Sequence, residues 1–282
     1  MNATLAALQK SGHLRRVDAT LGEWIARAFA GTSNETVLAA ALAARAIADG
    51  HSALALDQAQ AWLAGIADDT ALALPEASTW CEALRRSPAV LPHAVDAPAA
   101  CLPLVLDTQR RIYLRRYFEY EHRLAQALAA RASRAAAIDA DTANSASGLD
   151  PEQRHAIDIA SSRRFTLVTG GPGSGKTHSV LRMLAALATR AHARGETLRI
   201  ALAAPTGKAA ARLGESLRAQ IGKLDLAETI AAQIPRDAGT VHSLLGVSPW
   251  RVQPRFDHTT PLPYDVVVVD EVSMVDLPLM AK

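Results

Sequence analysis

Cysteine is scarce in this chain of 282 residues, which contains only Cys81 and Cys101. Two thiols cannot build the disulfide framework of a small secreted domain, so a reducing compartment is favoured. Neither cysteine belongs to a C-x-x-C pair or to a Cys/His cluster, which argues against a zinc site. No internal repeat is visible either.

Long hydrophobic runs are absent as well. The first residues lack a positive segment followed by an apolar stretch, which argues against a signal peptide. The longest apolar run of the first half, Val37 to Ala44, ends at Arg45 and is too short to span a bilayer. We therefore expect a cytoplasmic protein without a membrane partner.

Charge does not select a function class. The formal net charge is +2 and charged residues make up 21% of the chain, as in ordinary soluble proteins. A few local Lys and Arg residues are enough to follow a phosphate backbone, so nucleic acid is neither demanded nor excluded. Hydrophobic residues reach 49%, which is enough for two domains with cores.

Residues 1–130 are predicted to form a small helical domain with one hairpin. Gly31 would end a first helix, Asn34 would cap a second that ends at Gly50, and a third precedes Pro88. Their apolar positions recur at helical spacing: Leu21, Trp24, Ile25 and Ala28; Val37, Leu38, Ala41 and Leu42; Trp80, Cys81 and Leu84. Two apolar runs, 103–107 and 111–115, predict the hairpin, and a helix is expected over 120–130.

Residues 131–148 lose periodicity and are rich in Ala, Ser, Asp and Asn, which predicts a linker. In the second domain, 149–282, Asp150 and Pro151 suit the start of a helix. Apolar strands and helices then alternate: strands at 165–169, 198–203 and 265–269, helices at 177–194 and 207–219. This alternation predicts an α/β fold with a parallel sheet.

A phosphate-binding loop is the clearest motif. It fits G-x-x-x-x-G-K-[ST] between a predicted strand and a helix: Gly170, Gly171, Pro172, Gly173, Ser174, Gly175, Lys176 and Thr177. Its backbone N–H groups and the helix N-terminus would hold one anion. Lys176 would reach the β- and γ-phosphates of ATP, and the Thr177 hydroxyl would hold Mg²⁺. The alternative is a glycine-rich turn that binds nothing.

Two carboxylates, Asp270 and Glu271, end the last apolar strand. Asp270 would bind within the Mg²⁺ shell, and Glu271 would orient or deprotonate the attacking water. The alternative is a strand end with solvated acids.

Pro205, Thr206 and Lys208 lie in a turn between a strand and a helix. Exposed N–H groups at a helix start bind anions, and the loop already holds the triphosphate, so a nucleic acid phosphate is the predicted ligand. Thr240 and His242 offer further polar contacts. An ordinary turn, an N-cap and a surface histidine are the alternatives.

Two further features allow more than one interpretation. Gln153 would either close a capping box or read the edge of adenine. Four arginines around the hairpin alternate with tyrosines and would bind nucleic acid, bind a partner protein or form a solvated face: Arg110, Arg111, Arg115 and Arg116, with Tyr113, Tyr117 and Tyr120.

Four segments in this order, GGPGSGKT, APTGKAAARL, GTVHSLLG and VVVVDEVSM, resemble the first motor domain of superfamily 1 helicases of the 5′-to-3′ type. With the hairpin, they resemble RecD-like alpha subunits of exonuclease V. The resemblance covers 149–282 strongly and 15–130 loosely. It implies an incomplete RecA-like domain that ends soon after Glu271, without the second motor domain and its arginine.

The resemblance also implies roles and partners. Gln153 would contact adenine, Lys176, Thr177, Asp270 and Glu271 would serve ATP·Mg²⁺, and Pro205, Thr206, Lys208, Thr240 and His242 would face single-stranded DNA. The partners would be nuclease, helicase and scaffold subunits in a repair and recombination complex. As an N-terminal fragment, the chain alone is expected to bind ATP weakly and not to unwind DNA.

Two other functions remain open at the level of sequence. The chain would be a P-loop ATPase of another class, or a docking module that hydrolyses nothing. The APTGKAA segment argues against the first, because such ATPases need no second phosphate-binding turn. ATP hydrolysis stimulated by DNA would separate a translocase from both.

Overall fold

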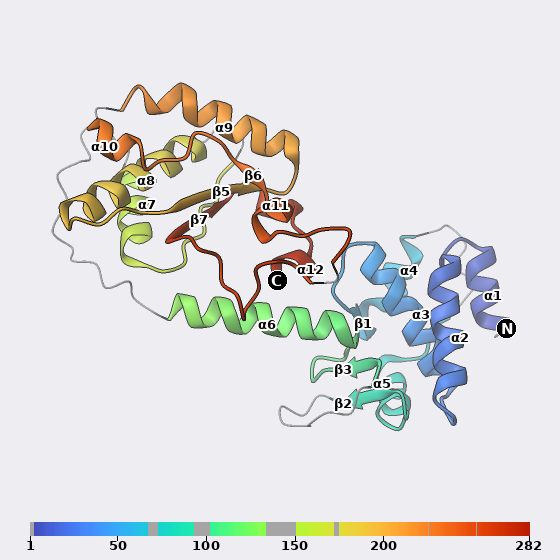
Figure 1. Cartoon of the computed structure of the whole chain (residues 1–282). Coiled ribbons are helices and arrows are strands. Elements are labelled where there is room, and N and C mark those ends of the chain that lie inside the picture. The colour runs from blue at the N-terminus through green and yellow to red at the C-terminus, as the bar shows by residue number, and fades with distance from the viewer. Residues whose placement is uncertain are drawn as a thin grey trace. The chain divides into compact units, whose positions relative to one another are not determined.

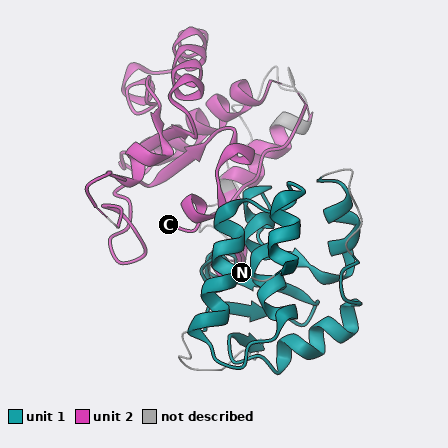
Figure 2. Ribbon diagram, turned by 90° about the vertical axis from the view of Figure 1, so that its right-hand side faces the viewer, with its two compact units in different colours: residues 1–123 teal, residues 124–282 magenta. Residues whose placement is uncertain are grey.

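The computed structural model describes residues 3–66, 73–92, 102–133, 151–171, 175–224, 226–251 and 253–282. They fall into two compact units, residues 1–123 and 124–282 (Figures 1 and 2). The division lies within the helix α6, Arg115–Ala132. The linker expected at 131–148 lies largely outside the described residues, so the domain limits 1–130 and 149–282 stay a prediction.

The first unit combines helices with a small sheet. The helices are α1 (Ala3–Lys10), α2 (Arg16–Ala28), α3 (Asn34–Ala48), α4 (Ala59–Ala64), α5 (Ala77–Arg85) and the start of α6. The sheet has the order β1-β4-β3-β2, with β1 at Leu54–Ala55, β2 at Val90–Pro92, β3 at Leu104–Leu106 and β4 at Arg111–Leu114. The predicted hairpin is confirmed, because β3 and β4 pair antiparallel.

The predicted start of the second helix is off by one residue. Ser33 is the N-cap of α3, and its side chain accepts from the N–H of Thr36, so Asn34 is the first helical residue. A serine hydroxyl satisfies an unpaired N–H there as an asparagine would. The glycine stops are confirmed: Gly31 and Gly50 follow α2 and α3 with φ of 85° and 91°.

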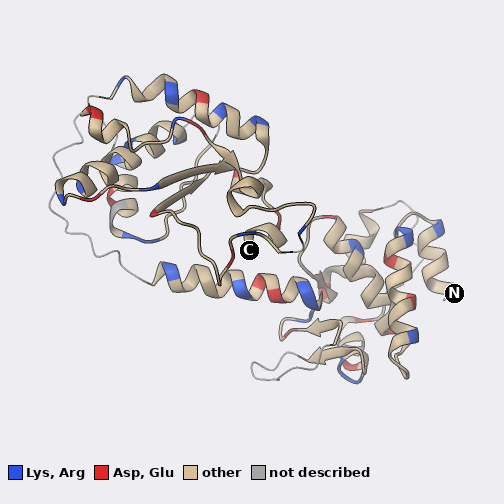
Figure 3. Ribbon diagram, in the orientation of Figure 1, with Lys and Arg blue, Asp and Glu red and all other residues tan. Residues whose placement is uncertain are grey.

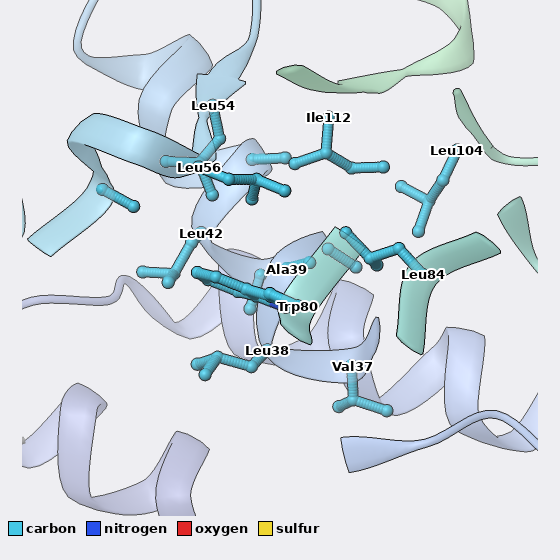
Figure 4. Close-up of a cluster of buried hydrophobic side chains, with 14 of the residues drawn as sticks. Val37, Leu38, Ala39, Leu42, Leu54, Leu56, Trp80, Leu84, Leu104 and Ile112 are labelled. Carbon is cyan, nitrogen blue, oxygen red and sulfur yellow. The ribbon is translucent and has the colours of Figure 1, made fainter. Parts of the chain in front are cut away.

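α3 lies at the centre of the first core. Trp80 of α5 is fully buried against it, and its indole Nε1 donates to the carbonyl of Glu35 at 2.9 Å. Figure 4 shows this ring among leucines from α3 and the sheet strands. Trp24 of α2 was expected in the same core, but it is 47% exposed. Only Ile25 of its predicted apolar set is fully buried, since one face of α2 is covered by α3.

α6 begins at Arg115, earlier than the expected residue 120. The Arg115 N–H donates to the carbonyl of Pro103, and the Arg115 guanidinium pairs with Glu119 one turn on. Such pairs at i and i+4 stabilise a helix start. The start of α6 therefore follows β4 without a loop.

The arginines around the hairpin are engaged within this unit. Arg110 pairs with Asp57 and Arg111 with Asp107, and the Arg116 Nε donates to the Tyr120 hydroxyl. Figure 3 shows both basic and acidic residues along α6. Neutralising partners weaken a phosphate-binding patch, which favours the interpretation as a solvated, ion-paired face.

The side chain of Tyr113, on β4, connects the hairpin to α6. Its ring is 1% exposed, and its hydroxyl donates to Oε1 of Glu121 at 3.1 Å. Burial first, and then the Glu121 carboxylate, raise the pKa of the Tyr113 phenol, so the hydroxyl remains a donor.

Tyr113→Phe is expected to lower the free energy of unfolding by about 1 kcal/mol, the usual net worth of one hydrogen bond. Urea unfolding measures this change. Tyr117→Phe, at a half-buried position on α6, is the matched control and should change stability by less than about 0.5 kcal/mol. Equal losses in both variants would contradict a specific Tyr113–Glu121 bond.

The second unit carries a parallel sheet of order β6-β5-β7. Its strands are β5 (Ile200–Ala204), β6 (Gly239–Thr240) and β7 (Val266–Val269). Its helices are α7 (Pro151–Ser162), α8 (Lys176–Ala193), α9 (Gly207–Ile221), α10 (Glu228–Ala231), α11 (Val241–Leu245) and α12 (Leu277–Met280). The predicted α/β class is confirmed, as are β5, β7, α8 and α9.

The strand predicted at Phe165–Thr169 is not formed. These residues have no regular structure, and Leu167 is 67% exposed. An apolar run becomes a strand only where a neighbouring edge accepts its backbone hydrogen bonds. β5 supplies such an edge to β7, and the ladder continues beyond it, since the Asp265 N–H donates to the Arg199 carbonyl.

Arg199 and Asp265 clamp the starts of β5 and β7. The Asp265 carboxylate accepts from the Arg199 N–H, from Nε and from Nη2 at 2.8–3.1 Å. The Arg199 side chain, followed by its backbone N–H, lowers the pKa of Asp265. This clamp helps to fix the register of the two strands and so the level at which both end.

Candidate nucleotide and nucleic acid site

The polar motifs gather where the three parallel strands end. Ala204 pairs with Thr240, and Ala203 pairs with Val269. Pro205, Thr240 and Asp270 therefore lie at one edge of the sheet. In open α/β sheets, ligands bind outside the carboxyl ends of the strands.

The phosphate loop is described at both of its ends. Gly175 has φ of 76° and serves as the N-cap of α8, which begins at Lys176. A positive φ favours glycine, which explains this residue at the last turn before the helix. Thr177 follows in the first turn and is half-buried. Pro172, Gly173, Ser174 and the side chain of Gln153 lie outside the described residues.

The Lys176 ammonium is held by the loop itself. Its Nζ donates to the carbonyls of Gly170 at 2.6 Å and Gly171 at 2.8 Å. Within the described ranges, no ion pair joins Lys176 to Asp270. The ammonium therefore occupies the loop through backbone carbonyls rather than through the carboxylates at the strand ends.

Asp270 and Glu271 are linked through the backbone. The Asp270 N–H donates to the Ala203 carbonyl, and one Asp270 carboxylate oxygen accepts from the N–H of Glu271 at 2.9 Å. Glu271 has φ of 50°, an uncommon conformation for a side-chain-bearing residue. Its side chain is exposed. Backbone strain of this kind gathers at functional sites, although it does not by itself assign one.

The oxygen donors suit magnesium. Mg²⁺ takes one or two protein oxygens and completes its shell with water and substrate phosphates. The Thr177 hydroxyl and the second carboxylate oxygen of Asp270 have this chemistry. In the part of the chain that is described, no three His, Cys, Asp or Glu side chains cluster as an independent metal site.

The turn after β5 is the start of α9. The Thr206 hydroxyl accepts from the N–H of Ala209 at 3.2 Å, which makes Thr206 the N-cap. Lys208 is exposed in the first helical turn. The N-cap role uses one lone pair of the hydroxyl and leaves its O–H as a donor.

The turn after β6 also begins a helix with a threonine N-cap, here the short helix α11. Thr240 caps α11 by accepting from the N–H of Ser243 at 3.1 Å. His242 is exposed on the first turn. The capping interpretation of Thr240 is thus confirmed, and this role does not prevent contact with a ligand.

A closed loop follows α11 and was not predicted from the sequence. The N–H groups of Arg255 and Phe256 both donate to the Leu245 carbonyl, which brings the loop back to its origin. Trp250 within it is 91% exposed. Gly246 ends α11 with φ of 65°, and a Cβ on it would lie 2.6 Å from the Arg255 Cβ. Gly246 was the one feature of the sequence that could have indicated this loop.

Two family models match the chain in succession. Residues 10–113 match the N-terminal domain of the RecBCD enzyme subunit RecD, and residues 153–282 match an AAA domain. Both matched regions of the chain are therefore similar to parts of helicase subunits of the RecD type. The first match falls on the helical unit, and the second includes the phosphate loop and both carboxylates.

Relatives extend the same likeness. A Mycobacterium tuberculosis protein named RecBCD enzyme subunit RecD is 42% identical over 259 residues, which are 90% of this chain and 42% of that protein. A protein of the same name from Mycolicibacterium smegmatis is 51% identical over 134 residues, 46% of this chain and 24% of that protein. The ATP-dependent RecD2 DNA helicase of Deinococcus radiodurans is 40% identical over 133 residues, 47% of this chain and 15% of that protein. The chain thus spans 42% of the length of the first of these relatives.

Among the described helices, none is both long and apolar enough to cross a bilayer.

Proposed function

We propose that this chain forms the ATP-binding part of a DNA helicase or translocase subunit in an exonuclease V-like complex. The observation that carries the proposal is the order of its two matched regions, a RecD N-terminal domain followed by an AAA domain with the phosphate loop. A generic P-loop ATPase would not explain the first region, and a docking module would not explain the second.

In this proposal, ATP binds at the phosphate loop with Mg²⁺. Lys176 leaves the loop carbonyls and contacts the β- and γ-phosphates, and Thr177 and Asp270 hold the metal shell. Glu271 takes the proton of the attacking water. Gln153, on α7, contacts the adenine. The metal supplies charge neutralisation, and the residues supply position.

Single-stranded DNA would lie along the carboxyl edge of the sheet. Pro205, Thr206 and Lys208 at the start of α9, with Thr240 and His242 at the start of α11, would contact its phosphates. N–H groups and hydroxyls at helix starts hold phosphates without reading sequence. The proposed movement is 5′-to-3′ on that strand.

The first unit would dock to partner subunits. Relatives named as RecBCD enzyme subunits belong to a multisubunit enzyme by that name. We propose nuclease, helicase and scaffold chains as partners here, and the cytoplasm as the compartment. The task of the complex would be DNA repair and recombination.

The test is ATP hydrolysis with and without single-stranded DNA, measured on the longest natural polypeptide that contains these residues. A translocase hydrolyses ATP faster when DNA is present. Hydrolysis that ignores DNA would assign the chain to another class of P-loop ATPase, and failure to bind ATP would favour a docking module.

Lys208→Ala is expected to weaken binding of single-stranded DNA about equally for all sequences. It should also reduce the slope of log affinity against log salt by about 0.7, the value for one phosphate contact on a single strand. Fluorescence anisotropy over a salt series measures both.

The matched control is Lys223→Ala, which removes an exposed lysine just after the other end of α9. It should leave the salt slope within error. A sequence-selective loss in Lys208→Ala would contradict a phosphate contact, and so would an equal loss in the control.

A further inference from the structure

A chain of polar side chains joins the start of α8 to the end of α9, two helices that pack together in the second unit (Figure 1). The Arg182 Nε donates to the His178 Nε2 at 2.9 Å, and the His178 Nδ1 lies 3.1 Å from the Gln220 Oε1. The Gln220 Nε2 donates to the Ser216 Oγ at 2.9 Å. All four side chains are half-buried.

The chain of contacts assigns the tautomer of His178. A guanidinium only donates, so the His178 Nε2 accepts and Nδ1 carries the proton. That proton then faces the Gln220 Oε1, and the amide NH₂ of Gln220 is left to donate to Ser216. Each donor meets an acceptor, which holds the His178 ring in one orientation.

These hydrogen bonds give the two helices a resistance to sliding that their apolar contacts lack. Leu181 and Leu184 of α8 share one buried cluster with Leu213 and Leu217 of α9. Apolar packing of this kind is non-directional and resists separation more than sliding. Hydrogen bonds depend on angle and distance, so the bridge through His178 fixes the register of α8 against α9.

The two ends of the bridge lie on functionally different helices. His178 follows Thr177 directly and shares the first turn of α8 with Lys176. Gln220 is in the last turn of α9, whose first turn carries Lys208. A displacement at the phosphate loop therefore has a short physical path to the proposed DNA contacts.

Nucleotide binding provides such a displacement. Lys176 now donates to the carbonyls of Gly170 and Gly171, and these bonds must break before the ammonium can reach a phosphate. The first turn of α8 then changes its contacts with the loop. Because the bridge resists sliding, α9 must follow α8 or lose the hydrogen bond at Gln220.

We propose that His178 is a positioning residue that transmits nucleotide binding from the phosphate loop to α9, and so to the Thr206–Lys208 turn. The ligand at the loop is a nucleoside triphosphate, and in that respect the inference rests on the proposed function. His178 touches neither ligand and acts through α8 and α9.

Hydrogen exchange tests the inference, measured on the longest natural polypeptide that contains these residues, with and without a saturating concentration of a non-hydrolysable ATP analogue and Mg²⁺. In the parent chain, the analogue should change the exchange rates of the last turn of α9 by about fivefold or more, the lower range of coupling between sites. His178→Phe keeps the shape of a ring but has no nitrogen, so that response should fall below about twofold while the analogue still binds.

Three further variants separate coupling from a general loss of structure. Gln220→Leu should lose the response as His178→Phe does, and it decides the question if the histidine variant fails to fold. Gln220→Glu keeps an acceptor for the His178 Nδ1 and should retain the response. His192→Phe makes the same substitution at an exposed position near the other end of α8 and should behave as the parent.

The outcomes distinguish the inference from the function on which it rests. An unaltered response at α9 in folded His178→Phe or Gln220→Leu overturns the inference. A parent chain that binds the analogue without any change at α9 also overturns it and leaves the proposed function standing. A parent chain that does not bind the analogue overturns both.

Discussion

Lys176→Ala is expected to weaken ATP binding sharply and to reduce ATP hydrolysis by roughly 10²- to 10³-fold, the scale for losing one positioned electrostatic contact. The variant removes the only side-chain cation of the phosphate loop. It also removes the two hydrogen bonds from Lys176 to the carbonyls of Gly170 and Gly171, which hold the loop against the start of α8. Fluorescence titration measures the change in nucleotide affinity. The change in hydrolysis is measured as turnover in a form of the protein that hydrolyses ATP.

The control for this variant is Lys223→Ala, which removes an equal charge from an exposed site in the same unit. It should alter neither affinity nor turnover. Circular dichroism should show Lys176→Ala folded, because the lysine side chain makes no contribution to the apolar core of α8. Parent-like affinity together with parent-like turnover would remove the assignment of the phosphate loop.

Periodicity predicted those elements whose burial is simple. β5 is buried along its whole length and was recognised as part of a nearly uninterrupted apolar run. α8 and α9 each bury one stripe, and both were predicted from the alternation of strands with helices along the second domain. The hairpin of β3 and β4 was predicted because apolar runs flank a polar turn. In each case local sequence and tertiary environment favour the same structure.

Prediction failed where the environment decides. Trp24 lies at helical spacing, yet its face of α2 is exposed, and no sequence period tells which of two apolar stripes finds a partner. Residues 165–169 have the composition of a strand but no ladder partner. α6 begins at Arg115 because a carbonyl from Pro103 and a carboxylate from Glu119 meet it there.

The candidate site also has parts that could be predicted from the sequence and parts that could not. Sequence motifs identified the phosphate loop, the two carboxylates and the starts of α9 and α11. The register of β5 with β6 and β7 then places the carboxylates and both helix starts along one edge of the sheet. The bridge from Arg182 through His178 to Gln220 was invisible in the sequence, since His178 and Gln220, which join the two helices, are 42 residues apart and no motif relates them. Contacts between helices require the tertiary structure.

Glu271→Gln is expected to preserve ATP binding while hydrolysis falls by roughly 10²-fold or more, the scale of lost general-base catalysis. Gln keeps the length and hydrogen-bonding capacity of the side chain but cannot accept the proton of the attacking water. Binding should persist because the substitution changes neither Lys176 nor the Asp270 carboxylate, whose hydrogen bond is to the Glu271 backbone N–H. Equilibrium binding and single-turnover hydrolysis separate the two effects.

The left-handed backbone of Glu271 offers a competing explanation, and a second variant decides between them. With φ of 50°, the residue is strained for any side chain, and glycine would relieve that strain. If the conformation alone mattered, Glu271→Gly would hydrolyse ATP as fast as the parent or faster. If the carboxylate is the base, Glu271→Gly and Glu271→Gln should be equally slow, whereas Glu215→Gln, at an exposed position on α9, should retain full activity. Parent-like rates in Glu271→Gln would exclude the carboxylate as the base and leave the backbone turn as the reason for this residue.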